Sequence, residues 1–138
     1  MSLNWTQESP AYWDKDKQTI VGGAPDGIFE LPQLADGDVI PGDWWRVDDD
    51  GTTIGYGWLD VTWGDAEMTL AVHPDHQEKG AGSFILEHLQ KEAAAKGINY
   101  LYNTVRPTHP DEYDVTRWLK KRNFIEHDDG VLRRPVSS

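Results

Sequence analysis

Residues 67–97 read EMTLAVHPDHQEKGAGSFILEHLQKEAAAKG, and this stretch decides the fold of the chain. Before Pro74, apolar residues alternate with polar ones, which predicts a strand that ends where proline removes a backbone donor. After Gly82, apolar residues recur at helical spacing as far as Gly97, which predicts an amphipathic helix with a left-handed glycine at its end. The apolar positions are Met68, Leu70 and Val72 on the strand, and Ile85, Leu86, Leu89 and Ala93 on the helix.

The turn between these elements has the sequence QEKGAG over residues 77–82. The first turn of a helix leaves N–H groups unpaired and carries partial positive charge, while glycines let an anion approach the backbone closely. Lys79 adds a positive charge of its own. The turn is therefore suited to phosphate, although a tight turn that needs small residues for its own geometry also explains the glycines.

The stretch resembles the acetyl-CoA motif of the GNAT superfamily of N-acetyltransferases. In that family an apolar-x-Val-x-Pro strand end is followed by Q/R-x-x-G-x-G/A and a long helix. This sequence has LAVHP at 70–74 and QEKGAG at 77–82, and the resemblance runs from about Trp44 to Phe124. The pattern differs from a dinucleotide-binding fingerprint, because the third glycine is missing and the strand belongs to a hairpin.

The resemblance implies acetyl-CoA as a cosubstrate. Amides of the first helical turn would hold its diphosphate, the strand backbone would pair with its pantetheine arm, and the N–H of Val72 would donate to the oxyanion of the reaction. The expected cofactor-binding residues are Leu70, Ala71, Val72, Gln77, Glu78, Lys79, Gly80, Ala81, Gly82 and Ser83.

Around this stretch the pattern predicts a β-meander and a crossover. Strands are expected at 44–48 and 53–63, and a two-residue turn at Gly64-Asp65 would place Thr62 opposite Glu67. A strand at 98–105 would run parallel to the strand at 67–73, because a helix connects them. The predicted fold class is α/β (α+β), a GNAT-like mixed and mostly antiparallel sheet with a splayed parallel pair, flanked by helices.

The two ends of the chain give weaker patterns. Residues 1–8 show no period and are expected to be loosely held. Ser9-Pro10 predicts the start of a helix that reaches Val21, with Gly22-Gly23 as its stop. Near the other end, a helix starting at Asp111 or Asp114 would finish at Asn123-Phe124, followed by a hairpin around residues 128–130.

Length, cysteine content and net charge limit the classes of function that the chain can have. The 138 residues fit one domain, 1–138, whose first third, 1–43, is short or divergent for the family. There is no cysteine, and the formal net charge of −11 argues against a nucleic-acid surface but attracts cationic substrates. No long apolar run is present, so a cytoplasmic protein without a membrane partner is expected. His73 and His76 form H-x-x-H without a third ligand, so no metal is expected.

Acetyl transfer to an amine needs a base for the ammonium proton, a donor for the oxyanion and a proton for the leaving thiolate. The resemblance implies Glu67 as the base, and Asp60 on the same polar face would recognise the charge of the substrate. The family often places its acid, a tyrosine, where this chain has Leu119. Tyr113 is the candidate substitute, with Tyr102 and His109 as alternatives.

The sequence thus predicts an N-acetyltransferase that acts on a small-molecule or peptide amine, cationic in character, in a possible homodimer. Two alternatives stay open. Leu119 and the short first third also fit a noncatalytic acyl-CoA-binding sensor or partner-docking module of the same fold. The seven tryptophans would fit a carbohydrate-binding β-domain, which requires that no helix follow Gly82.

Overall fold

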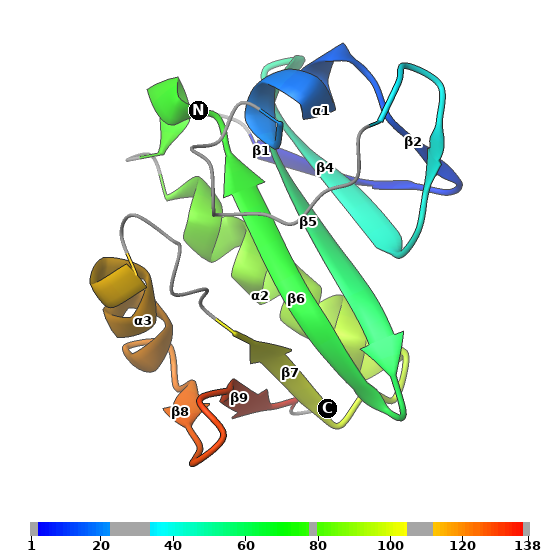
Figure 1. Ribbon diagram of the computed structural model, residues 1–138. Coiled ribbons are helices and arrows are strands. Elements are labelled where there is room, and N and C mark those ends of the chain that lie inside the picture. Colours follow the sequence, from blue (N-terminus) through cyan, green and yellow to red (C-terminus); the bar gives the residue numbers. More distant parts are fainter. Residues whose placement is uncertain (1–2, 23–33, 78–79, 105–111, 137–138) are drawn as a thin grey trace.

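A seven-stranded mixed sheet forms the centre of the molecule in the computed structural model, which describes residues 3–22, 34–77, 80–104 and 112–136 (Figure 1). Its strand order is β1-β4-β5-β6-β7-β9-β8, and all neighbours are antiparallel except β6 and β7. The strands are β1 (Leu3–Glu8), β4 (Asp43–Asp49), β5 (Thr52–Thr62), β6 (Asp65–Val72), β7 (Tyr100–Asn103), β8 (Ile125–Glu126) and β9 (Leu132–Pro135). The predicted fold class is confirmed.

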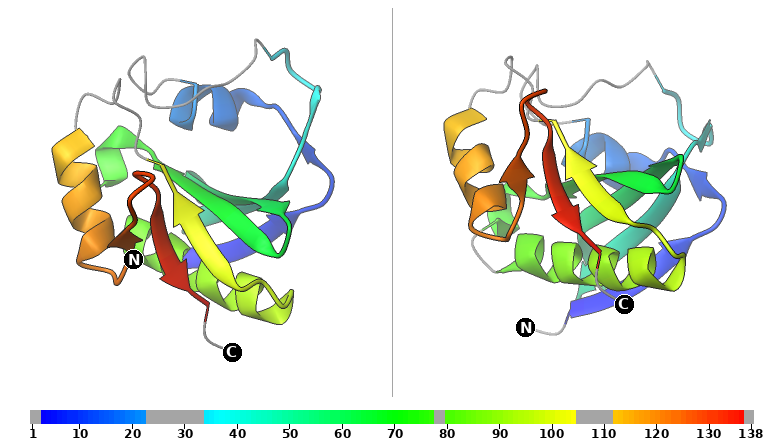
Figure 2. Two further views of the ribbon diagram at one scale, coloured as in Figure 1. Left: turned by 60° about the horizontal axis from the view of Figure 1, so that its bottom comes forward. Right: turned by 90° about the horizontal axis from the view of Figure 1, so that it is seen from below.

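Helices cover both faces of this sheet. The long helix α2 (Ala81–Ala95) lies against one face, and the short helix α1 (Lys15–Ile20) lies against the other (Figure 2). The remaining elements are the ribbon of β2 (Ala11–Tyr12) and β3 (Val39–Ile40), the 3₁₀ turn η1 (Pro74–His76) and the helix α3 (Glu112–Lys120).

The apolar stripe of α2 forms the core as the sequence predicts. Ile85, Leu86, Leu89 and Ala93 are all fully buried against the sheet. Burial of a side chain of leucine size contributes about 1.5–3 kcal/mol. The helix approaches β5 closely because Gly57 has no side chain, since a Cβ there would lie 2.5 Å from the Ile85 Cγ2 atom. Gly97 follows the helix with φ 72°, in the predicted left-handed conformation.

Residues 3–8 form a paired strand and are not loose, contrary to the prediction for residues 1–8, of which residues 1–2 lie outside the described residues. β1 pairs antiparallel with β4, and the Trp5 ring stacks on Trp45 with centroids 5.7 Å apart. The Trp5 indole N–H donates to the Glu92 carboxylate at 3.2 Å. The partners that order β1 lie far away in the sequence, so the local pattern of six residues with two apolar side chains did not show them.

The first helix begins later than Ser9-Pro10 predicts. Residues 11–12 pair with β3 instead, and Asp14 is the N-cap of α1, accepting from the Lys17 N–H at 2.9 Å. The helix ends at Ile20, close to the predicted stop. A carboxylate that can cap the helix outweighs the proline signal, as do the strand partners of Ala11 and Tyr12, which are Ile40 and Val39 and lie 29 and 27 residues away.

The β5–β6 hairpin turns one residue earlier than predicted. The turn residues are Trp63 and Gly64, with φ of 54° and 83°, so Glu67 lies opposite Asp60 rather than Thr62. This slip of two residues along β5 keeps every side chain on its predicted face, because side chains alternate with a period of two. The faces were therefore predicted correctly, and the partner of Glu67 was not.

The carboxyl-terminal third follows the prediction closely. β7 is the predicted parallel strand, shorter than 98–105, and α3 ends near Asn123, which has φ 70°. Phe124 is buried, and β8 and β9 form the predicted hairpin around residues 128–130. The proposed start at Asp111 lies outside the described residues.

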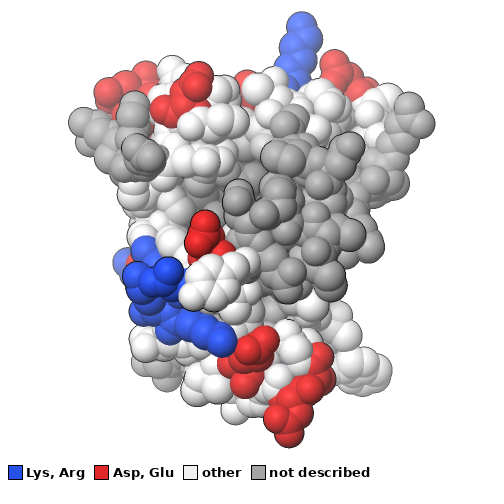
Figure 3. All heavy atoms as spheres, turned by 60° about the vertical axis from the view of Figure 1, so that its left-hand side comes forward, with Lys and Arg blue, Asp and Glu red and all other residues white. Residues whose placement is uncertain are grey.

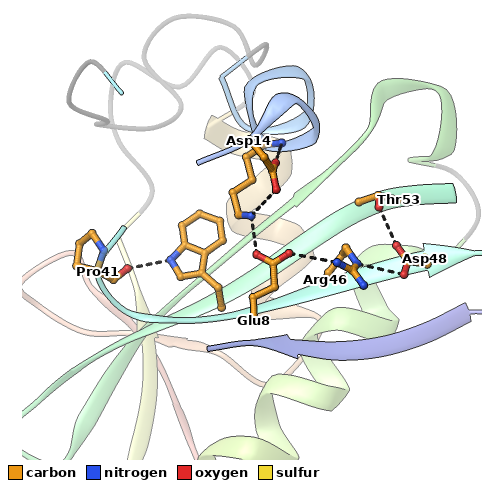
Figure 4. A network of polar contacts seen from close by, with 8 residues as sticks. Glu8, Asp14, Pro41, Arg46, Asp48 and Thr53 are labelled. Carbon is orange, nitrogen blue, oxygen red and sulfur yellow. Dashed lines mark hydrogen bonds and ion pairs between the residues drawn. The ribbon is translucent and has the colours of Figure 1, made fainter. Parts of the chain in front are cut away.

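A buried ion-pair network fastens α1 to the sheet (Figure 4). The Lys17 ammonium is fully buried, forms ion pairs with Glu8 and Asp14, and lies 4.8 Å from the centroid of the Tyr56 ring. The other Glu8 oxygen lies 3.4 Å from Arg46 Nη1. Each of these charges is balanced by a partner, so the helix is held over the sheet by matched charges as well as by apolar packing.

Lys17→Ala is expected to lower the free energy of unfolding by about 3 kcal/mol, because it empties a fully buried position and leaves the partly buried carboxylate of Glu8 short of positive charge. Lys15→Ala, an exposed lysine on the same helix, is the matched control. Urea denaturation followed by tryptophan fluorescence measures both. Equal losses in the two variants would contradict the structural role of the network.

Candidate cofactor and acceptor site

The parallel strands β6 and β7 separate soon after they meet. Their bridges join only residues 65–67 to residues 100–102, and in Figure 1 the two strands diverge toward their carboxyl ends. We call the place where the strands separate, beyond the bridge between Glu67 and Tyr102, the fork. There the Asn103 side-chain amide donates to the Met68 carbonyl at 2.8 Å. Beyond it, β6 continues to Val72 without a strand partner on this edge among the described residues.

The backbone groups on this free edge can be assigned. The His73 N–H donates to the Ile54 carbonyl of β5 at 2.7 Å. Because successive residues of a strand direct their backbone groups to opposite edges, those of Leu70 and Val72 face the fork, while those of Ala71 face β5. The Gln77 side chain donates to the Val72 carbonyl at 3.3 Å. An extended ligand can pair with Leu70 and Val72.

The amino terminus of α2 follows this edge after η1. Its N-cap residue is Gly80, with φ 76°, and within the part of the chain that the structure describes no side chain donates to or accepts from the cap. The first intrahelical bond runs from the Phe84 N–H to the Gly80 carbonyl at 3.1 Å. The N–H groups of Ala81, Gly82 and Ser83 therefore have no helical acceptor. A Cβ on Gly80 would meet nothing within 4 Å, so the turn is open to a ligand.

The predicted cofactor residues thus gather at one place. The strand edge at Leu70 and Val72, the side chain of Gln77 and the first turn of α2 follow one another along the fork. Glu78 and Lys79 lie outside the described residues.

One residue of this site was missed by the sequence reasoning. The Arg122 guanidinium donates to the Ser83 hydroxyl at 3.0 Å, at the first turn of α2. The sequence feature that could have indicated Arg122 is a cluster of four cationic residues within six positions of an otherwise acidic chain: Arg117, Lys120, Lys121 and Arg122.

A row of polar side chains crosses the sheet at the fork, on the face opposite α2. Asp60 is bridged to Glu67, and Glu67 to Tyr102, so the three side chains lie side by side on that face. Burial raises the pKa of Tyr102, and the charges of Glu67, Asp60 and Asp65 raise it further. The raised pKa keeps the phenol protonated at neutral pH and makes it a weaker acid than an ordinary tyrosine.

Asp60 is exposed within this row, but one of its carboxylate oxygens lies close to the backbone before β4. A Cβ on Gly42 would lie 2.8 Å from the Asp60 Oδ1 atom, so the carboxylate rests against the backbone before β4. Burial raises the pKa of Asp60, and the nearby charge of Asp43 adds to the effect. A cationic ligand at this position would relieve the repulsion between the two carboxylates.

Asp60→Asn is expected to stabilise the fold at pH 7 and to weaken the binding of a cationic amine. Because the folded pKa lies above the unfolded value, stability falls as pH rises through the folded pKa, and asparagine removes that loss. The gain is absent below about pH 3, where both states are protonated, and it stays below about 1 kcal/mol because solvent screens an exposed side chain. Thermal unfolding between pH 3 and 7 and the amine KM measure the two effects. A variant that is destabilised at pH 7 would contradict this account.

The two positions considered for the acid differ sharply in environment. Leu119, where the family often has tyrosine, is 2% exposed and belongs to the main core. Tyr113 on α3 is 72% exposed, and its ring lies 5.6 Å from the Arg117 guanidinium carbon. His109 lies outside the described residues. Leu119 therefore serves packing in this chain, and Tyr113 is accessible from solvent.

His73, Trp44 and Trp58 take structural places, whereas Trp63 is 97% exposed in the turn between β5 and β6. His73 Nδ1 accepts from the Asp75 N–H at 3.1 Å and caps η1, and the described ranges contain no group of three or more potential metal ligands. Trp44 and Trp58 are buried and stacked with centroids 4.1 Å apart. Because α2 follows Gly82, the carbohydrate-binding hypothesis is wrong. None of the described helices is long and apolar enough to cross a bilayer.

Solved structures share this architecture. The ribosomal-protein-S18-alanine N-acetyltransferase from Escherichia coli is 16% identical, with a TM-score of 0.59 over 98% of this chain and 96% of that chain. A putative GNAT acetyltransferase from Desulfovibrio desulfuricans is 20% identical, with a TM-score of 0.59 over 70% of this chain and 71% of that one. N-acetylglutamate synthase from Neisseria gonorrhoeae, complexed with coenzyme A and L-arginine, is 21% identical, with a TM-score of 0.59 over 69% of this chain and 25% of that one.

The sequence comparison agrees with the fold. No curated protein sequence matches the chain. The profile described as acetyltransferase (GNAT) domain matches residues 41–126, well over half of the chain. This span contains the β-meander, the fork and α2. The chain belongs to the GNAT superfamily of acetyltransferases.

Proposed function

We propose that this protein transfers an acetyl group from acetyl-CoA to a primary amine, by direct attack of the amine within a ternary complex. The observation that carries the proposal is the free edge of β6, which is followed after η1 by the first turn of α2, whose N–H groups have no side-chain cap among the described residues. Two structural neighbours support it, because the Neisseria synthase holds coenzyme A and a Sinorhizobium meliloti phosphinothricin acetyltransferase holds AcCoA.

The cofactor would lie along the fork. Its diphosphate would accept from the amides that open α2, where the helix dipole favours negative charge. Its pantetheine arm would pair with the free edge at Leu70 and Val72, as a further strand pairs with a sheet edge. The N–H of Val72 is the proposed donor to the oxyanion. Gln77, Glu78, Lys79 and Ser83 complete the proposed set around the diphosphate.

The acceptor amine would approach on the polar face beside the fork. Glu67 is the proposed base, which takes the ammonium proton directly or through a water molecule. Asp60, its cross-strand neighbour, would attract a cationic small-molecule or peptide amine. The amine attacks the thioester itself, since the chain has no cysteine to carry an acyl group. We place the whole activity in one domain, 1–138.

Tyr113 is the proposed acid for the leaving thiolate. Tyr113→Phe is expected to lower kcat about tenfold at unchanged cofactor affinity, because only the proton is removed. Tyr102→Phe is the matched comparison, since Tyr102 lies at the last bridge between β6 and β7 and is the alternative donor. Steady-state kinetics with both variants decides between them. A loss confined to Tyr102→Phe would transfer the role to that residue.

A second candidate function is an acyl-CoA-binding sensor or docking module without catalysis. The burial of Leu119 at the family's acid position favours it. Release of the CoA thiol, measured with a panel of polyamines, aminoglycosides, amino acids and peptides, separates the two functions. Turnover with any of these amines rules out the sensor, and tight acetyl-CoA binding without turnover across the panel would overturn the proposed transferase.

A further inference from the structure

Arg122 links the end of α3 to the beginning of α2. Its Nη2 atom donates to the Ser83 hydroxyl at 3.0 Å, and its Nη1 atom donates to the Trp118 carbonyl at 3.1 Å. The guanidinium carbon lies 3.8 Å from the centroid of the Trp118 ring. Two hydrogen bonds and one stacked face hold the group in a defined position beside the first turn of α2.

That position is electrostatically unfavourable for a cation. The amino terminus of a helix carries partial positive charge, so it repels a guanidinium. Burial lowers the pKa of Arg122, and only the more distant charge of Glu87 acts against this. Among the described residues Arg122 forms no ion pair, although the chain carries 24 carboxylate side chains. A bound anion would satisfy both the guanidinium and the helix amides.

A purely structural role explains only part of this geometry. An arginine near the end of a helix stabilises its last carbonyls, and the bond to Trp118 does this for α3. The contact with Ser83 reaches a different helix, 39 residues away in the sequence. A guanidinium has five N–H donors in a planar fork, and these two bonds leave others for a phosphate oxygen.

The Trp118 indole borders the first turn of α2 beside the Arg122 guanidinium. A Cβ on Gly82 would lie 3.4 Å from the Trp118 Cζ2 atom, so the indole covers the first turn of α2 from one side. Figure 3 brings this side of the molecule forward and shows Lys and Arg side chains gathered in one patch on it. Arg117, Lys120 and Lys121 are exposed, whereas Arg122 is half-buried against α2.

We infer that Arg122 binds the cofactor diphosphate, as a guanidinium clamp that α3 supplies across the first turn of α2. The inference rests on the proposed function, since it assigns a residue to the same cofactor site. It makes the docking of α3 on α2, through Trp118 and Arg122, a condition for tight cofactor binding.

The test is a calorimetric measurement of three ligands with the wild type and two variants. The ligands are acetyl-CoA, 3′-dephospho-CoA, which keeps the diphosphate, and pantetheine, which lacks it. Arg122→Gln is expected to weaken both diphosphate ligands by about 10- to 100-fold, since each hydrogen bond to a charged group is strong. It should leave pantetheine unchanged. The control Lys121→Gln removes the neighbouring exposed charge and should change each affinity by less than about threefold.

Each other result overturns the inference. Wild-type affinity in Arg122→Gln would leave Arg122 as a helix cap. An equal loss for pantetheine would show an effect through the fold, and a loss for acetyl-CoA without one for 3′-dephospho-CoA would move the contact to the 3′-phosphate. If Arg122→Gln does not fold, Arg122→Lys gives the same comparison, with a smaller loss expected for the diphosphate ligands alone. Absence of acetyl-CoA binding by the wild type would instead reject the proposed function.

Discussion

Gly80→Val is expected to weaken acetyl-CoA binding by at least about a hundredfold, because a branched side chain disfavours the left-handed backbone that opens α2. Gly80 has φ 76° and open space around its missing Cβ. Valine would therefore change the backbone that presents the free amides and would also place a side chain in the turn where the diphosphate is proposed to lie. Isothermal titration calorimetry measures the loss.

Gly97→Val is the matched control for this experiment. Gly97 stands at the other end of the same helix, with φ 72° and nothing within 4 Å of a Cβ. The two substitutions impose the same kind of backbone strain, about 1–2 kcal/mol, on the two ends of α2. Both variants should lose similar stability, but only Gly80→Val should lose cofactor affinity. Equal affinity losses would mean that strain in α2 causes the loss of binding, and not a change in the turn where the diphosphate is proposed to bind.

Glu67→Gln is expected to lower kcat by about 10²- to 10³-fold, because glutamine cannot take the proton from the attacking ammonium. Cofactor affinity should stay within about threefold of the wild type, since Glu67 lies on the far side of the fork from the first turn of α2. Steady-state kinetics with an accepted amine and calorimetry with acetyl-CoA measure the two quantities.

Asp65→Asn is the control for Glu67→Gln. Asp65 lies two residues earlier on β6, on the same face, and is bridged to Thr62 at the closed end of the hairpin. The Asp65→Asn substitution removes one carboxylate from the same face, so it reproduces the change in local charge without altering the proposed base. A fall in kcat of the same size in both variants would show that the charge of this face matters, and would remove Glu67 from its role as base.

The elements that the sequence predicted are those with local causes. The stripe of α2 is visible in its own spacing, and the faces of the β5–β6 hairpin follow from strict alternation. The partner of Glu67 was wrong because the turn uses Trp63 in a left-handed conformation, which bulky residues rarely adopt. Local patterning thus defined what each face carries, while an unusual turn residue decided which side chains meet.

The features that escaped prediction depend on distant contacts. β1 is ordered by β4 and by Glu92, which lies 87 residues from Trp5. Arg122 reaches Ser83, at the first turn of another helix. The sequence showed a cluster of cations near the end of α3, but nothing in it showed that one of them reaches the amino terminus of α2. Contacts of this kind follow from helix docking, which composition and periodicity do not specify.

We propose that the free edge of β6 and the first turn of α2 together hold the cofactor. Backbone amide chemical shifts, followed by NMR during titration of the wild type with acetyl-CoA, test it most directly. The account predicts saturable changes that are largest at the amides of Leu70, Val72 and residues 80–83. Binding that leaves these amides unchanged, or no binding at all by the folded protein, would contradict it.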